Sequence, residues 1–298
     1  MTSIESLEPA LNDFMARERL PSTYRDTVNT WFLPLAHDLL HKVAHSRQAP
    51  VIGVSGCQGS GKSTLAALLV LLLRELMGLR CVNLSIDDFY LSRNEREALG
   101  ERVHPLLRTR GVPGTHDVAL ALATLRALRE PGTVPIPRFD KGVDDRRAIA
   151  DWPPIAAPVD VIVLEGWCLC IGPQDDAALA APINTLEAEE DTTGAWRRYV
   201  NAQLRGPYVD FYAMVDYLVM LKAPDFEQVY RWRQRQEDKL AASVSGEAAS
   251  AVMSPAALRR FIQHYERLTR HGLATLPAQA DVVFELGTEQ NIVACSKR

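Results

Sequence analysis

The feature that most constrains the fold is a short glycine-rich segment, "GCQGSGKST", at residues 56–64. It joins the apolar, β-branched run "APVIGVSG" at 49–56, which predicts a strand, to a leucine-rich run at 62–77, which predicts a helix. A second strand is predicted at 79–86, "LRCVNLSI". Strand, helix and strand within about 35 residues form a βαβ unit, whose two strands pair in parallel. The segment therefore favours an α/β protein built on a parallel sheet.

The rest of the chain continues this alternation. Strands are predicted at 160–166, 216–223 and 280–286, the last being the final strand, and helices at 118–130, 225–240 and 254–272. This order predicts a doubly wound, mostly parallel sheet with helices on both faces. Two segments rich in small or acidic residues, 171–196 and 241–255, are expected to be irregular, the second as a mobile loop.

Residues 1–48 are expected to form a helical extension that packs on this core. The helices should be interrupted near Pro21 and Pro34, because proline lacks the backbone N–H that a helix interior needs. His37, His41 and His45 would share one helical face, where solvation is favoured over a metal site because no carboxylate cluster accompanies them. The nucleotide-binding domain would then occupy residues 49–298.

The charge and the cysteine content of the chain limit the classes of binding partner and the cellular compartment that we expect. A formal net charge of −4 over 298 residues gives no electrostatic reason to expect nucleic acid or an anionic membrane as a partner. Five cysteines at irregular spacing are typical of reduced thiols rather than of a disulfide framework. The N-terminal segment lacks the apolar stretch of a signal peptide and the bias of a transit peptide. We expect a cytoplasmic protein, monomeric or homodimeric, that binds small molecules.

The glycine-rich segment matches the P-loop pattern G-x-x-x-x-G-K-[ST], which binds nucleotide phosphates. Its glycines allow backbone amides to curl around a phosphate, and the following helix directs its positive N-terminal end at it. Lys62 can reach the β- and γ-phosphates, while Ser63 can place a hydroxyl on Mg²⁺. The expected nucleotide-binding residues are Gly56, Gln58, Gly59, Ser60, Gly61, Lys62, Ser63 and Thr64.

Carboxylates follow two of the predicted strands. Asp87 and Asp88 end the strand after the P-loop helix, and Glu165 ends the strand at 160–166. The carboxyl ends of parallel strands meet at the sheet edge where ligands bind. A carboxylate there could orient an acceptor hydroxyl, and Glu165 could hold Mg²⁺ or its water shell together with Ser63. If the strand keeps its pleat, Asp87 and Asp88 point to opposite faces and cannot share one role.

The P-loop predicts a nucleotide but not a reaction. A GTPase normally carries an Asn-Lys-x-Asp segment that reads guanine, and this chain has none. The strand at 160–166 ends in a glutamate, Glu165, rather than in the aspartate expected before a GTPase switch loop. A small-molecule kinase and a mechanical or regulatory ATPase both stay compatible with these residues.

Five segments together resemble the phosphoribulokinase/uridine kinase/pantothenate kinase group, and more closely its D-glycerate 3-kinase branch. They are "SIDDFYLS" at 85–92, "RGVPGTHD" at 110–117, "PIPRFDKGVDDR" at 135–146, "LEGW" at 164–167 and "APDFEQVYRWRQRQE" at 223–237. The resemblance implies a P-loop kinase that transfers the γ-phosphate of MgATP in line to a small hydroxy acid, most readily D-glycerate. It places the catalytic carboxylate on Asp87. A nucleoside, a pantothenate-like acid or a phosphosugar are the alternative acceptors.

The resemblance also implies a lid, at about 225–255, that covers the phosphates. The segment "YRWRQRQEDKL" offers Arg231, Arg233 and Arg235, which do not all share one helical face. Arg231 and Arg235 are one turn apart and are expected to bind nucleotide, whereas Arg233 best matches the family's lid motif. Which of them reaches the phosphates stays open. The expected catalytic set is Lys62, Asp87, Glu165 and Arg233.

Two loops, at about 104–117 and 135–150, are expected to bind the acceptor. A hydroxy acid needs a cation for its carboxylate, ideally a guanidinium, and both loops carry basic and polar side chains. Trp167 is expected to be either a pocket wall or part of the core. The candidate substrate-binding residues are Asp88, Tyr90, Arg110, Thr115, His116, Asp117, Arg138, Lys141 and Arg146.

Overall fold

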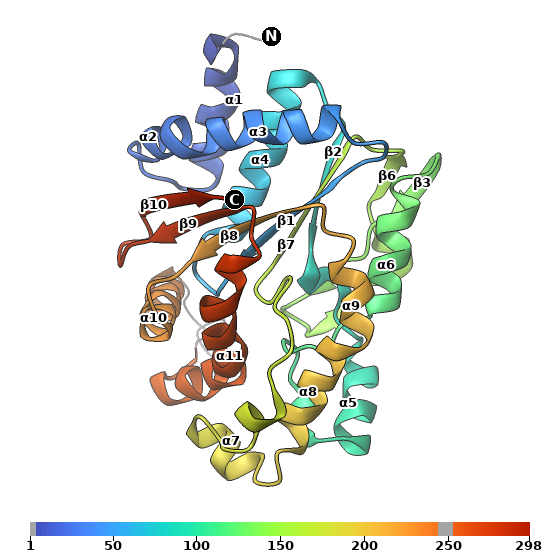
Figure 1. Cartoon of the computed structure of the whole chain (residues 1–298), viewed down its shortest axis with the longest axis vertical. Helices are drawn as coiled ribbons and strands as arrows, with labels where there is room; N and C mark the ends of the chain where they lie inside the picture. The colour runs from blue at the N-terminus through green and yellow to red at the C-terminus, as the bar shows by residue number, and fades with distance from the viewer. Residues whose placement is uncertain (1–3, 244–252) are drawn as a thin grey trace.

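A six-stranded sheet forms the centre of the computed structural model, which describes residues 4–243 and 253–298 (Figure 1). Its strand order is β10-β9-β8-β1-β7-β2. All neighbouring strands pair in parallel except β10, which runs antiparallel to β9. The strands are β1 (Val51–Gly56), β2 (Cys81–Ser85), β7 (Val161–Gly166), β8 (Tyr217–Lys222), β9 (Val282–Leu286) and β10 (Ile292–Lys297).

Both faces of the sheet are covered, which confirms the doubly wound prediction. Along β1, Ile52 and Val54 are buried in one hydrophobic cluster, while Val51 is buried in the other. This alternation reflects the pleat, which directs successive side chains to opposite faces. Helix α4 (Lys62–Met77) covers one face, and α6 (Val118–Ala127), α8 (Ala195–Arg205) and α9 (Pro207–Tyr212) cover the other (Figure 1).

The carboxyl-terminal part of the chain differs from the prediction in its last strand. The strand at 280–286 is not the final one, because β10 follows it and pairs through the register Cys295↔Phe284. Helices α10 (Phe226–Ser243) and α11 (Pro255–Thr275) lie between β8 and β9 in sequence. Residues 241–243 belong to α10 rather than to the expected loop, and 244–252 lie outside the described residues.

The N-terminal segment is helical and packs on α4. It consists of α1 (Ile4–Arg17), α2 (Tyr24–Thr27), a π-helical turn (Val28–Phe32) and α3 (Leu33–Ala44). The chain is non-helical around Pro21, as expected, but the predicted break at Pro34 is wrong. Helix runs unbroken from 24 to 44, because Pro34 lies at the start of α3, directly after π-type pairing that changes the local pattern of N–H bonds.

The segment at 171–196 is more ordered than its composition suggests. It contains a 3₁₀ turn (Asp176–Leu179), α7 (Thr185–Glu190) and the first residues of α8. Two of its acidic side chains are buried, and an arginine pairs with each: Arg267 with Glu187, and Arg197 with Asp191. The prediction of an irregular segment was therefore wrong for the 3₁₀ turn and for α7, while residues 171–175 and 180–184 form no helix or strand. Charge content alone does not reveal a buried ion pair.

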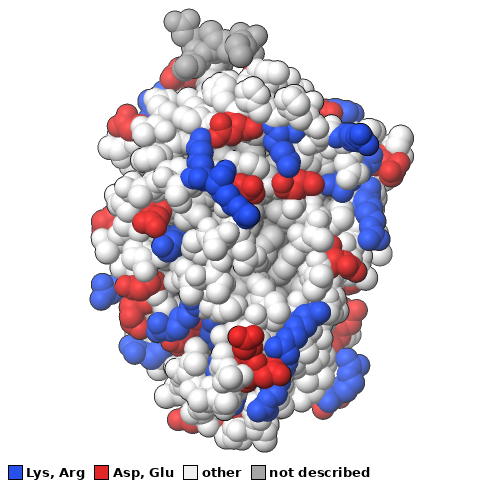
Figure 2. Space-filling model, viewed as in Figure 1, with Lys and Arg blue, Asp and Glu red and all other residues white. Residues whose placement is uncertain are grey.

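The remaining elements are short. They are α5 (Arg93–Arg102), the antiparallel pair β3 (Gly132–Pro135) and β6 (Pro154–Ala157), the pair β4 (Phe139–Asp140) and β5 (Asp145–Arg146), and 3₁₀ turns at Ile86–Phe89, Pro105–Arg108, Ile149–Asp151 and Leu276–Ala278. Acidic and basic side chains are interspersed on the face shown in Figure 2. In the described part of the chain, no helix combines the length and apolar character that crossing a membrane requires.

Candidate active site

The P-loop leaves the end of β1 and enters α4 with the geometry that the glycine pattern requires. Gly59 and Gly61 have φ values of 78° and 85°, in the left-handed region that other residues rarely adopt. A Cβ atom at Gly56 would lie 2.5 Å from the Ser60 hydroxyl oxygen. The loop therefore needs its glycines for backbone conformation at two positions and for space at a third.

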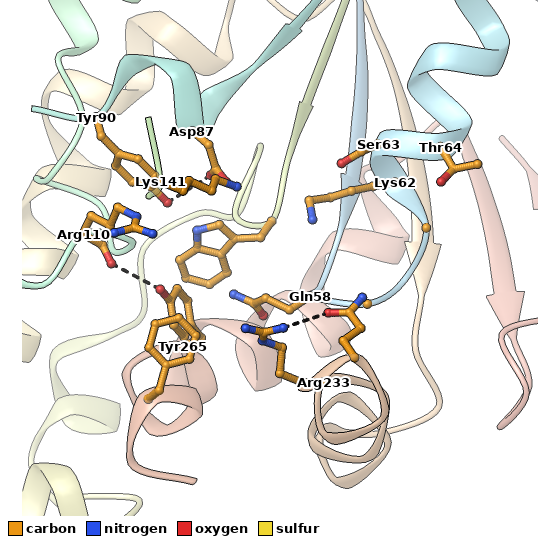
Figure 3. Close-up of a pocket in the computed structure, with 15 residues that line it drawn as sticks. Gln58, Lys62, Ser63, Thr64, Asp87, Tyr90, Arg110, Lys141, Arg233 and Tyr265 are labelled. Atoms are coloured by element: carbon orange, nitrogen blue, oxygen red, sulfur yellow. Dashed lines mark hydrogen bonds and ion pairs between the residues drawn. The ribbon is translucent and has the colours of Figure 1, made fainter. Parts of the chain in front are cut away.

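A cavity of about 480 Å³ opens between this loop and the ends of β2 and β7. Figure 3 shows Lys62 on one wall, pointing across the cavity toward Asp87. Tyr90, Lys141 and Arg110 stand on the Asp87 side, and Arg233 enters from α10. Of the predicted site residues, the cavity is lined by Gln58, Gly59, Gly61, Lys62, Ser63, Thr64, Asp87, Tyr90, Arg110, Lys141 and Arg233.

The two adjacent aspartates lie in a 3₁₀ turn, because β2 already ends at Ser85. The alternation of a strand therefore does not apply to them, yet they have different partners. An oxygen of Asp87 lies 2.6 Å from the Lys141 ammonium, and its other oxygen accepts a 3.0 Å hydrogen bond from the Tyr90 hydroxyl. Asp88 forms a 2.9 Å ion pair with Arg138 and accepts from the backbone N–H of Phe139 at 3.2 Å.

These surroundings shift the two carboxyl groups in opposite directions. Burial by itself would raise the pKa of Asp87, but the ammonium of Lys141, with a further contribution from Lys62, holds that pKa below its ordinary value. For Asp88, burial outweighs the attraction of Arg138, and its pKa is raised. Asp87 is the carboxylate that lines the cavity, and Asp88 is not among the lining residues.

Ser63 and Glu165 are arranged as oxygen ligands for a divalent cation. The Ser63 hydroxyl donates a 3.0 Å hydrogen bond to one carboxylate oxygen of Glu165. The other oxygen of Glu165 is buried and has no hydrogen-bond partner among the described residues. Residues 4–243 and 253–298 contain no group of three acidic, histidine or cysteine side chains that could by itself hold a metal ion. Mg²⁺ does not need one, since nucleotide phosphates and water complete its coordination, so these residues fit Mg²⁺.

Of the three arginines expected to lie on a lid, Arg233 is the one that lines the cavity. Its guanidinium pairs with the buried Glu237 and donates to the Gln236 side chain at 3.2 Å. Arg235 instead forms two 3.0 Å hydrogen bonds with Glu289. Arg231 is exposed and is not among the residues that line the cavity.

Several predicted substrate residues lie one layer behind the cavity and connect its loops. His116 is buried, stacks on Tyr90 with ring centroids 4.5 Å apart, and contacts the Tyr208 hydroxyl at 2.6 Å. The Thr115 hydroxyl donates to the Val112 carbonyl, while Asp117 caps α6. Arg146 donates to the Tyr90 carbonyl at 2.8 Å and 3.1 Å and pairs with Asp117, as Arg138 does with Asp88.

Helix α11 supplies a part of the cavity wall that was not among the predicted site residues. Tyr265 and Phe261 line the cavity, one helical turn apart. The Tyr265 hydroxyl donates to the Arg110 carbonyl at 3.2 Å, and its ring meets Trp167 edge-on at 4.9 Å. Trp167 is both pocket wall and core, since it lines the cavity yet is 5% exposed. An aromatic pair on an amphipathic helix is an ordinary core signal, so nothing local pointed to a site.

The sheet order, the P-loop and the carboxylates at the strand ends define a P-loop kinase fold. Residues 51–170 match the phosphoribulokinase/uridine kinase family. The chain is 32% identical over 253 residues to an uncharacterized kinase of Schizosaccharomyces pombe, covering 82% of this chain and 83% of that protein. The chain belongs to the phosphoribulokinase/uridine kinase family.

Two further comparisons involve D-glycerate 3-kinases. The chain is 32% identical over 239 residues to the chloroplastic D-glycerate 3-kinase of Arabidopsis thaliana, covering 77% of this chain but about half, 49%, of that protein. The structure of D-glycerate 3-kinase from Cryptococcus neoformans superposes with a TM-score of 0.72 at 24% identity, covering 90% of this chain and 99% of that one. The second likeness shows a shared fold.

Proposed function

We propose that this protein is an ATP-dependent phosphotransferase whose acceptor is D-glycerate. The observation that carries the proposal is the position of Asp87, a carboxylate on the cavity wall opposite Lys62, with Lys141 and Arg110 beside it. A carboxylate next to two cations suits an acceptor that has both a hydroxyl and a carboxylate. The similarity to the chloroplastic D-glycerate 3-kinase supports the same acceptor.

The residues divide the reaction between the two sides of the cavity. The P-loop amides and Lys62 would hold the β- and γ-phosphates, and Arg233 would approach them from α10. Ser63 and Glu165 would hold Mg²⁺, which neutralises phosphate charge when bound. Asp87 would orient the acceptor hydroxyl and receive its proton as the oxygen bonds to the γ-phosphorus. The bond between that phosphorus and the β,γ-bridging oxygen breaks in the same step, and ADP leaves with the electron pair. A lowered pKa suits this role, because a loose phosphoryl-transfer transition state needs positioning more than it needs a strong base.

The acceptor's carboxylate would bind Arg110, assisted by Lys141. Arg110 forms an ion pair with Asp144 and lies over the ring of Phe139 at 5.4 Å, so its guanidinium is held at the cavity wall. A guanidinium has five N–H donors, and the pair with Asp144 leaves donors for a second carboxylate. A nucleoside would make no use of these two cations.

A coupled assay of ADP release against a panel of acceptors tests the proposal. We expect D-glycerate to stimulate release from MgATP, and uridine, pantothenate and ribulose 5-phosphate to do so weakly or not at all. Stimulation by a different member of the panel would reassign the acceptor. Release of ADP that no acceptor stimulates would favour a regulatory ATPase and would contradict the proposal.

A further inference from the structure

A second cavity, of about 440 Å³, borders the P-loop. It shares Gly59, Gly61, Thr64 and Gln236 with the first cavity, so the P-loop contributes to both. Its other walls come from opposite ends of the chain, the stretch at 20–32 and the stretch at 286–292. In Figure 1, α2 lies over the hairpin of β9 and β10, which brings these two ends together.

The wall from the N-terminal extension carries an aromatic ring. Tyr24 is half-buried, and its ring centroid lies 6.1 Å from that of Phe32. Phe32 in turn meets Phe284 of β9 edge-on at 5.6 Å, so the aromatic side chains are anchored to the sheet. Leu20 and Pro21 extend this apolar wall. A ring fixed in this way offers a flat surface for a second ring to stack on.

The opposite wall is a turn that tertiary contacts hold in place. Gln290 adopts a left-handed φ of 64°, which is sparsely populated for residues other than glycine, and its side-chain amide donates to the Gly59 carbonyl. The side chains of Trp232 and Gln228, both on α10, donate to the Thr288 carbonyl at 2.8 Å and 2.9 Å. The turn is therefore fixed between the P-loop and α10, and its residues Glu289, Gln290 and Asn291 line the cavity.

We propose that this cavity binds the base of the nucleotide, and that the N-terminal extension is thereby part of the nucleotide site. Tyr24 would stack on the base, and the amides of the 287–291 turn would meet its hydrogen-bonding edge. Phosphates held by the P-loop would bring the attached nucleoside to this cavity, because the loop borders both cavities. The inference rests on the proposed function for the presence of a nucleotide and goes beyond it in assigning residues 20–32 to its recognition.

The test compares two ligands that share phosphates and differ in the base. Dissociation constants of MgADP and of magnesium tripolyphosphate are measured by calorimetry on the full chain and on Tyr24→Ala. We expect Tyr24→Ala to weaken MgADP about tenfold, the order of one base-aromatic stack, and to leave tripolyphosphate unchanged. Tyr24→Phe, which keeps the ring, should bind MgADP like the unmodified protein. Trp31→Ala is the matched control, because Trp31 is aromatic, lies in the same segment and packs on Phe284 but does not line the cavity.

The outcomes separate this inference from the proposed function. Unchanged MgADP binding in Tyr24→Ala, or an equal loss for MgADP and tripolyphosphate, would overturn the inference while leaving the kinase proposal standing. A protein that binds MgADP through Tyr24 but phosphorylates no acceptor would sustain the inference and overturn the proposed acceptor. If the unmodified protein binds no nucleotide, both fail.

A second measurement needs no variant and so does not depend on Tyr24→Ala being folded. The unmodified protein is photolabelled with 8-azido-ATP, and the modified peptides are identified by mass spectrometry. We expect label within residues 20–32 or 286–292, and protection by excess MgADP. Protectable label confined to other segments would place the base elsewhere and overturn the inference.

Discussion

Asp87 and Asp88 are neighbours in sequence, but the loops around them give each a different environment. Lys141 and Tyr90 contact Asp87 at the cavity, whereas Arg138 and the Phe139 backbone contact Asp88 behind it. The doublet is thus one carboxylate that faces the ligand space and one that fastens the 135–150 loop to the 3₁₀ turn.

At this scale we predict that Asp87→Asn lowers kcat by at least about a hundredfold, because the amide cannot accept the acceptor's proton. The dissociation constant of MgADP should change little, since Lys62 and the P-loop amides are untouched. Asp88→Asn is the matched control and should lower kcat much less. Steady-state kinetics together with nucleotide titration provide the measurement. If Asp88→Asn alone produces the large loss, the catalytic carboxylate has been assigned to the wrong residue.

The pH dependence of the reaction tests the contact between Lys141 and Asp87. Asp87 must be ionised to accept a proton, and Lys141 lowers its pKa against the opposing effect of burial. Removing the ammonium in Lys141→Ala leaves the burial in place, so the pKa of Asp87 should rise. As pH is lowered, kcat/KM of this variant should begin to fall at a higher pH than in the unmodified protein. Lys222→Ala, which removes a lysine paired with Glu285 away from the cavity, should leave the profile unmoved. If kcat/KM of Lys141→Ala falls at the same low pH as in the unmodified protein, Lys141 does not lower the pKa of the catalytic carboxylate.

At the scale of elements, the acidic stretch before α8 is held by ion pairs with the carboxyl-terminal helix. Arg267 of α11 makes two hydrogen bonds with Glu187 of α7, at 2.6 Å and 2.7 Å, and donates to the carbonyls of Ala178 and Ala181. Both partners are buried, with side-chain exposures of 7% and 0%. This pairing explains why a stretch of irregular composition folds into short helices against α11.

We therefore predict that Arg267→Leu lowers the free energy of unfolding by about 3–5 kcal/mol, because it leaves the Glu187 carboxylate buried without a partner. Arg260→Leu is the control on the same helix. Arg260 also makes two hydrogen bonds with a glutamate, Glu190, but with side-chain exposures of 51% and 38%. Its loss should cost only about 0–1 kcal/mol. Chemical denaturation of both variants measures these losses of unfolding free energy. Similar denaturation midpoints for the two variants would show that burial of the ion pair does not determine its contribution to stability.

At the scale of the whole molecule, nucleotide binding should stabilise the fold, because the P-loop and the two cavities draw on segments from both ends of the chain. MgADP at about 100 times its dissociation constant should add about 2.7 kcal/mol of stability. For a chain of 298 residues that corresponds to a rise in Tm of roughly 4 °C. Calorimetry with increasing MgADP measures it. Lys62→Ala should lose most of the shift and abolish turnover, and an undiminished shift in that variant would mean that nucleotide binds away from the P-loop.

Local sequence determined the framework of this protein. The order of strands and helices, the P-loop and its glycines, and the placement of Asp87 and Glu165 at strand ends all follow from patterns within a few residues, because backbone conformation and periodicity are local properties. These patterns predicted the doubly wound sheet, which the structure confirms, and they named most of the residues that line the first cavity.

Tertiary structure alone decided which side chains meet. The contact of Lys141 with Asp87, the choice of Arg233 over Arg235 at the cavity, the wall formed by Tyr265, and the pairing of β10 all join segments far apart in the chain. Tertiary structure also decided the place of the N-terminal extension, because its Tyr24 and the P-loop line the same second cavity. Such contacts depend on how helices and strands pack together. The local periodicity of a sequence does not indicate which distant residues come into contact. The sequence thus specified the fold, the P-loop and the carboxylates Asp87 and Glu165, while packing specified which charges and walls meet around them.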